Sequence, residues 1–396
     1  MPSEHKDRVL SEMETALAGL QERSQLRNFT KIEGVNFCSN DYLGLSEDSR
    51  LKTALIEAVE NAKHVGGTGS RLLSGHDLLW NELEEEFADF AGTESALYFA
   101  NGYAANIGLL TAVLGKSDVV FSDELNHASL IDGIRLSGAR REIYPHLDLN
   151  ALEALLRLHK NERCRKVIVT ESVFSMDGDI ADLLAVQELA ARNDASLIVD
   201  EAHATAVHGP GGAGLVARAG LCNEVLGVVH TCGKALASAG GFVCGSHLLR
   251  DFLINHARTL IFSTAMPAYM AGQIRAALGL AKEMEHERKV LLENSRGIAS
   301  VLRADGWDLS GTDSQIIPVV VGSNVDALSA AQFLQVQGFA IRAIRPPTVP
   351  AGSSRLRLSL TSRITAKGLN RLRESLADWQ ASQMAMSTSS RTAAEA

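Results

Sequence analysis

The sequence predicts an α/β protein with a mostly parallel sheet flanked by helices and a smaller α+β domain at its C-terminal end. Up to about residue 280, short β-branched runs alternate with helical patterns. Such alternation is typical of βαβ units, whose sheet is covered by helices on both faces. After residue 284 the pattern changes to a long charged helix followed by strands. A chain of 396 residues is long enough for two or three domains with a large core.

The same patterns divide the chain into four segments. We expect an N-terminal helical segment over residues 1–45, a large domain over 46–284 and a small C-terminal domain over 285–383. Residues 384–396 (AMSTSSRTAAEA and the residue before it) have the composition of a tail without fixed structure.

The individual elements follow from periodicity and turn residues. Apolar residues at helical spacing predict helices over 5–27 and 78–90, and the second follows the glycine-rich turn 66–70. In the large domain we predict strands at 96–100, 118–121, 166–170, 196–199, 225–230 and 241–244, with helices such as 149–160 and 183–193 between them. In the small domain we predict strands near 316–321 and 355–360, then a final helix.

Composition excludes several classes of function. A net charge of −9 argues against nucleic acid as a main partner and gives no reason to expect attraction to an anionic membrane. The five scattered cysteines form no C-x-x-C pair, and the first twenty residues lack an apolar signal core, which together predict a cytoplasmic protein. Residues 96–115 carry no formal charge, but their glycines and asparagines favour a buried strand and a packed helix over a membrane span.

Lys234 and Asp200 carry the most chemical information. Lys234 lies in the run TCGKA, and Asp200 begins Asp-Glu-Ala-His directly after an apolar strand. An acid at the end of one strand and a lysine after the next are what pyridoxal phosphate (PLP) chemistry requires. The lysine bonds covalently to the cofactor's aldehyde, and the acid keeps the ring nitrogen protonated so that the ring can withdraw electrons.

Three further runs are compatible with a PLP site but are ambiguous alone. Asn101-Gly102-Tyr103 stands where a strand meets a helix, and a helix N-terminus can bind phosphate. An ordinary strand-to-helix turn explains these residues at least as well. His127 could stack on an aromatic ring or simply start a helix, and the hydroxyls of residues 172–178 could contact a ring substituent or cap a turn.

Competing motifs fail on their spacing. Gly115-Lys-Ser would need a glycine at the position of Leu110 to be a phosphate-binding loop, and Leu72 stands where a dinucleotide fingerprint needs its third glycine. A metal site of Asp200, His203 and His208 matches no familiar ligand spacing.

Taken together, four runs resemble the α-oxoamine synthases, fold-type I PLP enzymes that join an amino acid to an acyl thioester. They are 36–45 (NFCSNDYLGL), 66–76 (GGTGSRLLSGH), 200–203 (DEAH) and 231–234 (TCGK). The resemblance covers roughly residues 10–380. It implies a fold-type I transferase that binds PLP in the large domain, and a homodimer whose active site lies at the subunit interface.

The resemblance also implies roles for individual residues. Lys234 would bond to PLP and transfer protons, Asp200 would pair with the ring nitrogen and His127 would stack on the ring. Further expected contacts are Ser175 and His203 at the phenolic oxygen; Gly102, Tyr103 and Thr231 at the phosphate, with Ser263 or Thr264 from a second subunit; and Arg357, Arg27 and Ser353 at the substrate.

Within the family, runs 344–352 (IRPPTVPAG), Arg355-Leu-Arg357 and 261–267 (IFSTAMP) are most similar to the member that acts in biotin synthesis. This resemblance implies condensation of L-alanine with a pimeloyl thioester, on coenzyme A or acyl carrier protein, with loss of carbon dioxide. Glycine C-acetyltransferase and 5-aminolevulinate synthase, which use glycine, are the alternatives, because one methyl group discriminates by only about 1–3 kcal/mol. A catalytically silent relative that serves as a binding protein is a more remote alternative.

The chain also departs from the family pattern. Ala206 and Ala213 replace a glycine and an arginine after the aspartate motif, and Ile364 replaces a histidine. Residues 144–148 (YPHLD) differ from the usual His-Asn-Asp. We expect the turn at Ala206 to survive unless its backbone needs a positive φ.

Overall fold

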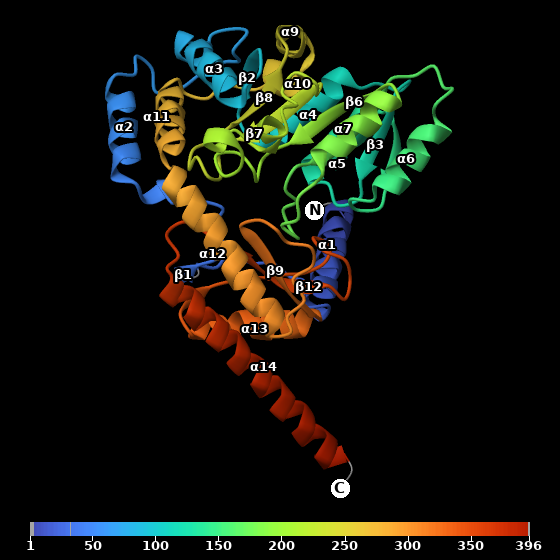
Figure 1. The fold of residues 1–396 in the computed structure, drawn as a ribbon, viewed down its shortest axis with the longest axis vertical. Helices are drawn as coiled ribbons and strands as arrows, with labels where there is room; N and C mark the ends of the chain where they lie inside the picture. The colour runs from blue at the N-terminus through green and yellow to red at the C-terminus, as the bar shows by residue number, and fades with distance from the viewer. Residues whose placement is uncertain (1–3, 32, 395–396) are drawn as a thin grey trace.

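The larger sheet of the molecule forms the body of the upper half in Figure 1. The computed structural model describes residues 4–31 and 33–394. Seven strands lie in the order β2-β8-β7-β6-β5-β3-β4, and only β8 runs antiparallel to its neighbours. The strands are β2 Ser95–Phe99, β3 Val119–Asp123, β4 Arg140–Tyr144, β5 Lys166–Glu171, β6 Ala195–Asp200, β7 Gly227–Thr231 and β8 Gly241–Gly245. The predicted α/β class with a mostly parallel sheet is confirmed.

Helices cover both faces of this sheet (Figure 1). Adjacent residues of β6, Leu197 and Ile198, belong to different buried clusters, as expected for a strand whose side chains alternate between two covered faces. The helices of this part are α2 Ser49–Glu60, α3 Leu78–Ala91, α4 Gly102–Val113, α5 Ala128–Ser137, α6 Leu149–Leu158, α7 Leu183–Arg192, α8 Leu215–Arg218, α9 His247–His256, α10 Arg258–Ile261 and α11 Tyr269–Glu283, with short 3-10 turns at Leu45–Glu47 and Pro210–Gly212.

A second, antiparallel sheet lies below the first in Figure 1, in the order β11-β12-β9. The long helix α12 runs down from α11 to this sheet (Figure 1). The elements of this half are α1 Glu4–Glu22, β1 Val35–Asn36, α12 Glu285–Ala304, β9 Ile316–Gly322, α13 Asn324–Val336, β10 Phe339–Ala340, β11 Ala343–Ile344, β12 Ser354–Ser359 and α14 Ala366–Ala394. β1 pairs with β10, so the N-terminal segment joins the C-terminal half.

Helix α1 ends at Glu22, earlier than the predicted helix over 5–27, and two further differences from the predicted elements have a clear cause in the sequence. Strand β4 is absent from the prediction because Arg140, Arg141 and Glu142 give this exposed edge strand no apolar alternation. Helix α14 continues to Ala394, past residue 384, where composition predicts an unstructured tail. The uncharged stretch 96–115 is a buried strand followed by a helix, as predicted. Among the described residues, no helix combines the length and apolarity needed to cross a membrane.

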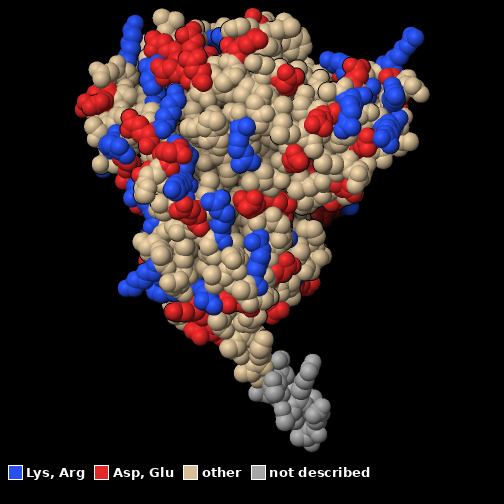
Figure 2. Space-filling model, in the orientation of Figure 1, with Lys and Arg blue, Asp and Glu red and all other residues tan. Residues whose placement is uncertain are grey.

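The parallel strands end at the edge of the sheet that faces the smaller sheet. Asp123, Glu171, Asp200 and Thr231 are the last residues of their strands. In open α/β sheets ligands bind outside these carboxyl ends. On the face shown in Figure 2, acidic and basic side chains are intermixed without an extended basic patch.

Candidate active site

A cavity of 470 Å³ lies at the carboxyl ends of the parallel strands. It brings together seven of the residues that the sequence singles out, which come from separate strands and helix starts. They are Gly102, Tyr103, His127, Asp200, His203, Thr231 and Lys234. Four further residues in its wall, Asn40, Asn106, Ser129 and Glu171, were not among the predicted site residues.

Lys234 lies in the turn after β7 and is partly exposed in the cavity wall. Burial lowers the pKa of its amine to about 8, although the charge of Asp200 opposes this shift, and the charge of Arg357 lowers the pKa further. Near neutral pH this amine can therefore both release and accept a proton.

Asp200, the last residue of β6, is buried, and its carboxylate is held at both oxygens. Oδ1 accepts a hydrogen bond from the backbone N–H of Ala202 at 2.7 Å, and Oδ2 accepts one from the Asn106 amide at 2.6 Å. These two donors fix the orientation of the carboxylate.

Asn106 also connects Asp200 to His127. Its amide donates to the Ser129 hydroxyl at 2.9 Å, and that hydroxyl lies 2.7 Å from Nδ1 of His127. The backbone N–H of Ser129 donates to the same Nδ1 at 3.2 Å, so this nitrogen carries no proton and the neutral ring keeps its proton on Nε2. Burial, with the nearby charge of Lys234, lowers the pKa of His127 despite the charge of Asp200. A polar residue within the apolar helix α4 is the sequence signal that points to Asn106.

Glu171 ends β5 and lies beside Asp200 in the register of the sheet. It is buried, and its carboxyl accepts a hydrogen bond from the backbone N–H of His127 at 2.5 Å. Burial, together with the charge of Asp200, raises the pKa of Glu171 well above its usual range, so we expect a neutral acid here. The sequence signal for this residue is an acid directly after the apolar run 166–170.

The start of α4 forms a cradle for a phosphate group. Gly102 is the first residue of the helix, and a Cβ at this position would lie 2.4 Å from the methyl group of Thr231, so only glycine permits this approach. The first N–H groups of a helix lack partners within the helix and attract anions. The Tyr103 hydroxyl donates to Asp132, so the phenol is engaged away from the cradle and Tyr103 can offer its backbone N–H.

The residues present fit PLP. The cavity holds an amine for the aldehyde, a buried carboxylate for the ring nitrogen and a helix N-terminus for the phosphate, all in one wall. His203 adds a ring whose Nδ1 lies 2.6 Å from the Tyr42 hydroxyl. Burial, reinforced by the charge of Lys234, lowers the pKa of His203 well below its usual range, so this imidazole is neutral.

A second cavity of 620 Å³ shares His127 with the first. Ser175 and Arg27 line it, and Arg27 donates a hydrogen bond to the Thr348 hydroxyl at 3.1 Å. Much of the remaining wall is apolar, with contributions from Leu125, Ile131, Phe174, Met176, Pro347 and Val349.

Three predicted site residues line neither of these cavities: Ser353, Thr264 and Arg357. The Ser353 hydroxyl donates to the carbonyl of Pro350 at 2.8 Å, on the loop before β12. Thr264 lies with Ser263 beside a small hollow near Arg71. The structure of one chain therefore does not bring Thr264 to the cofactor cavity of that chain.

Arg357, on β12, reaches the site from the smaller sheet. Its Nε donates to the carbonyl of Ser175 at 2.5 Å, and its Nη1 donates to Asn40 at 3.1 Å and to Ser359 at 2.6 Å. The guanidinium also interacts with the Tyr42 hydroxyl. Because Asn40 also lines the cofactor cavity, Arg357 stands where it can bind a carboxylate held beside Lys234.

Ala206, Ala213 and Ile364, which depart from the family pattern, line neither active-site cavity. Ala206 has a φ of 64°, so the turn does adopt the left-handed conformation that a glycine would accommodate without strain. Glu201, in the motif that precedes this turn, is fully buried and accepts hydrogen bonds from the backbone N–H groups of Leu215 and Val216, each at 2.8 Å. Burial raises the pKa of Glu201 to about 7. Ala213 and Ile364 are buried in the core, where nothing in the structure assigns them a chemical role.

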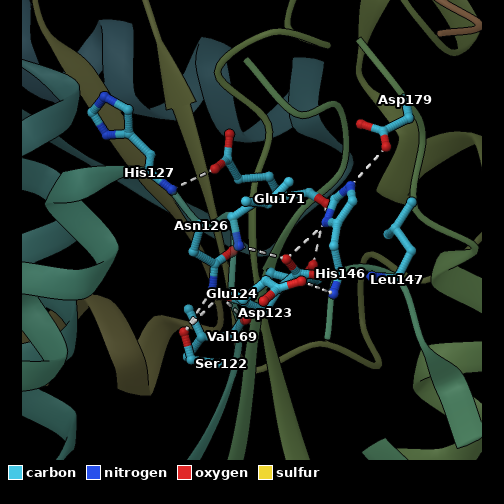
Figure 3. Close-up of polar contacts among 12 residues, drawn as sticks. Ser122, Asp123, Glu124, Asn126, His127, His146, Leu147, Val169, Glu171 and Asp179 are labelled. Carbon is cyan, nitrogen blue, oxygen red and sulfur yellow. Dashed lines mark hydrogen bonds and ion pairs between the residues drawn. The ribbon is translucent and has the colours of Figure 1, made fainter. Parts of the chain in front are cut away.

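His146, at the loop that follows β4, lies between two carboxylates (Figure 3). Its Nδ1 lies 2.8 Å from Asp123 and its Nε2 lies 2.6 Å from Asp179. Burial opposes a charge on the ring, but the hydrogen bonds and charges of both aspartates outweigh it and raise the pKa of His146 to about 10. The ring is therefore an imidazolium that donates to both acids.

This raised pKa predicts a pH-dependent contribution to stability. Because the pKa in the folded protein exceeds the unfolded value near 6.5, the contribution is complete below pH 6.5 and is lost as pH rises to about 10. After allowance for solvent screening, we expect about 2 kcal/mol. Urea unfolding of the wild type and His146→Gln at pH 6 and pH 10.5 measures it. A difference between the two proteins that stays constant over this range would contradict the assigned charge.

Comparisons with known proteins agree with this geometry. The family model for aminotransferase class I and II matches residues 32–376. A Bacillus cereus protein named a candidate 8-amino-7-oxononanoate synthase is 42% identical over 90% of this chain and 93% of its own, and a second such protein from Bacillus velezensis is 41% identical over 93% and 92%.

Solved structures show the same fold. A serine palmitoyltransferase of S. paucimobilis with a bound PLP–myriocin aldimine has a TM-score of 0.86 at 28% identity, covering 96% of this chain and 99% of its own. The 8-amino-7-oxononanoate synthase of Francisella tularensis has a TM-score of 0.76 at 26% identity, covering 89% and 99%. The chain therefore belongs to the aminotransferase class I and II family and, within it, to the α-oxoamine synthases of the 8-amino-7-oxononanoate synthase type.

Proposed function

We propose that this protein condenses L-alanine with a pimeloyl thioester to give 8-amino-7-oxononanoate, carbon dioxide and the free thiol carrier, a step of biotin synthesis. The observation that carries the proposal is one cavity that holds Lys234 and Asp200, with Arg357 close enough for its charge to lower the pKa of Lys234, and a second, largely apolar cavity that adjoins it at His127. The names of the relatives at 41–42% identity support the same reaction.

Three residues of the first cavity have proposed tasks in the chemical steps. When bound, PLP supplies an aldehyde and an electron-withdrawing ring that accepts the negative charge left at the α-carbon of the amino acid. Lys234 takes the α-proton and later returns one, since its lowered pKa permits both transfers. Asp200 holds the proton on the ring nitrogen, and neutral His127 covers the ring without adding a competing charge.

The other residues hold the groups in place. We assign the phosphate to the backbone at Gly102 and Tyr103 and to Thr231, and the phenolic oxygen to His203 of this cavity and Ser175 of the adjoining one. Arg357 binds the carboxylate of the amino acid, for which a guanidinium offers paired donors. Arg27 and Ser353 contact the acyl donor from the rim.

The second cavity suits the acyl chain of a pimeloyl group. Pimelate is a dicarboxylic acid, so its thioester keeps one free carboxylate at the far end of an apolar chain. The wall offers apolar side chains for the methylenes and Arg27 for that carboxylate. The pKa of Arg345 is lowered mainly by burial and also by the positive charge of Arg27, so the two arginines lie near each other. An uncharged long acyl chain would have no use for this positive charge, which favours pimeloyl over palmitoyl.

Arg357→Lys should weaken amino acid binding more than it slows the chemical step. Lysine keeps the positive charge but loses the fork that donates to Ser175, Asn40 and a carboxylate together. We expect the KM for L-alanine to rise by about 10–100-fold and kcat to change by less than about 5-fold. Steady-state kinetics measures both. An unchanged KM would exclude Arg357 as the carboxylate clamp.

We further propose a homodimer in which Thr264 of one subunit reaches the phosphate of the other. Thr264 lines no part of the cofactor cavity of its own chain. Large apolar side chains near it and in the glycine-rich segment 66–75 are exposed, among them Phe262 at 71% and Leu73 at 83%. Such exposure marks a protein–protein contact. Light scattering should give twice the chain mass, and Thr264→Ala should weaken PLP binding.

An absorbance titration of the holoenzyme separates the candidate functions. A visible band that responds to L-alanine at lower concentration than to glycine or L-serine supports the proposal. A preference for glycine would move the assignment to glycine C-acetyltransferase or 5-aminolevulinate synthase, and a preference for serine to the activity of the palmitoyltransferase neighbours. Absence of any band with added PLP would leave a binding protein without catalysis.

A further inference from the structure

His146 links three separate elements at the carboxyl end of the large sheet (Figure 3). Its ring contacts Asp123 at the end of β3 and Asp179 in the segment after β5. Its own backbone N–H donates to Glu124 at 2.9 Å, and the next backbone N–H, of Leu147, donates to Asp123 at 2.9 Å. The charged groups that face the ring from these elements are therefore Asp123, Glu124 and Asp179.

Asp179 stands at the base of a closed loop, residues 172–179, which we call the 172–179 loop. Val173 pairs with Ile180 across the base, and within the loop the N–H of Gly178 donates to the carbonyl of Phe174 at 3.0 Å. The ring of Phe174 packs edge-on against the imidazole of His146, with 4.4 Å between centroids. His146 thus holds the base of the loop by a charged hydrogen bond and by an aromatic contact.

The tip of the same loop holds the two arginines of β12. The Ser175 carbonyl accepts from Nε of Arg357 at 2.5 Å, and Asp177 forms an ion pair with Arg355. The position of Arg357 therefore depends on where the loop lies, and the loop is tied to the large sheet through His146.

We propose that His146 is a positioning residue that fixes the 172–179 loop to the end of β3 and thereby places Arg357 for the carboxylate of the amino acid substrate. The inference rests on the proposed function, because it takes Arg357 as the carboxylate clamp. It assigns His146 no contact with substrate or cofactor. The cost of losing it should appear in amino acid binding, since a shift of about 1 Å in a positioning group can change affinity and rate by 10–100-fold.

The chain supplies a matched control in His159. This ring also lies between two acids, 2.8 Å from Glu162 and 3.3 Å from Glu142, and also packs edge-on against a phenylalanine, Phe121. It anchors the edge strand β4 and lines neither active-site cavity. Nδ1 of His159 differs in one respect, because it also lies 2.8 Å from Nη2 of Arg140. His146→Phe and His159→Phe therefore each remove a ring that lies between two acids and packs on a phenylalanine, and only His146 lies next to the 172–179 loop.

The first experiment measures kinetics and L-alanine binding on the holoenzymes. For His146→Phe we expect the KM and the apparent Kd for L-alanine to rise by about 10-fold while kcat stays within about 3-fold of wild type. His146→Gln, which keeps donors toward the acids, should recover most of the affinity, and His159→Phe should match wild type. Unchanged L-alanine affinity in His146→Phe, or an equal loss in both phenylalanine variants, would overturn the proposal.

A second measurement needs neither substrate nor a correct assignment of function. Hydrogen exchange of the wild-type and variant proteins reports the loop directly, and we expect faster exchange at the amides of residues 174–181 in His146→Phe than in His159→Phe. If His146→Phe does not fold, Asp179→Asn takes its place, because it weakens the same hydrogen bond and leaves no unpaired charge on the loop. Faster exchange in His146→Phe, combined with a wild type that binds no amino acid, would uphold the loop anchor while the proposed function falls. Equal exchange in all variants would overturn the anchor itself.

Discussion

Lys234→Ala is expected to reduce turnover by at least about 10⁴-fold, because one side chain both attaches the cofactor and moves the substrate proton. Its amine is the group in the cavity whose pKa of about 8 suits proton transfer in both directions. The variant should still fold, since Lys234 is partly exposed and the turn around it is held by backbone hydrogen bonds such as Ser238 N–H to the carbonyl of Cys232 at 2.9 Å.

A charge-preserving variant distinguishes lost chemistry from lost charge. Lys234→Arg keeps the positive charge beside Asp200, but a guanidinium neither bonds to the aldehyde nor gives up its proton. We therefore expect Lys234→Arg to be as inactive as Lys234→Ala. Borohydride reduction of the wild-type holoenzyme, followed by peptide mass analysis, should mark the peptide that contains Lys234. Turnover within about 10-fold of wild type in either variant would remove Lys234 from the proposed role.

Asp200→Asn is expected to lower kcat by about 10²–10⁴-fold while PLP still binds. The amide can accept the hydrogen bond from Ala202 through Oδ1, but its Nδ2 then faces the Asn106 amide, donor to donor. More importantly, a neutral amide cannot hold a proton on the ring nitrogen, so the ring withdraws electrons less strongly. The phosphate cradle at Gly102 is untouched, which is why cofactor affinity should change much less than rate.

The adjacent acid provides the control for this variant. Glu201 is as deeply buried as Asp200, but its carboxylate accepts the backbone N–H groups at the start of α8 and lines no active-site cavity. Glu201→Gln should therefore lower stability and leave kcat within about 3-fold of wild type. If Glu201→Gln slows turnover as much as Asp200→Asn, the acid that matters has been assigned wrongly.

Sequence patterns predicted much of the fold because most strands of the large sheet are buried on both faces. Their apolar runs, as in β5 and β6, stand out between amphipathic helices. Strand β4 could not be recognised, since an exposed edge strand is stabilised by pairing with β3 and not by the apolarity of its own residues. The C-terminal part of helix α14 was also missed, because its polar sequence has no apolar repeat that would extend the predicted helix.

Within the site, the sequence indicated residues that lie at strand ends or helix starts and carry a recognisable motif. Lys234 and Asp200 are of this kind. Asn106, Ser129 and Glu171 were missed because their importance comes from contacts between distant segments: Asn106 reaches Asp200 across 94 positions of the chain. The loop anchor at His146 likewise depends on residues from three elements, which no local pattern brings together.

The measurement that tests the account most directly is a product assay with purified protein, PLP, L-alanine and a pimeloyl thioester. The account predicts 8-amino-7-oxononanoate by mass spectrometry, with one carbon dioxide and one free thiol released for each product molecule. Lys234→Ala should form none of the three. Thiol release without the amino ketone, or faster product formation from glycine or L-serine than from L-alanine, would contradict the proposed reaction.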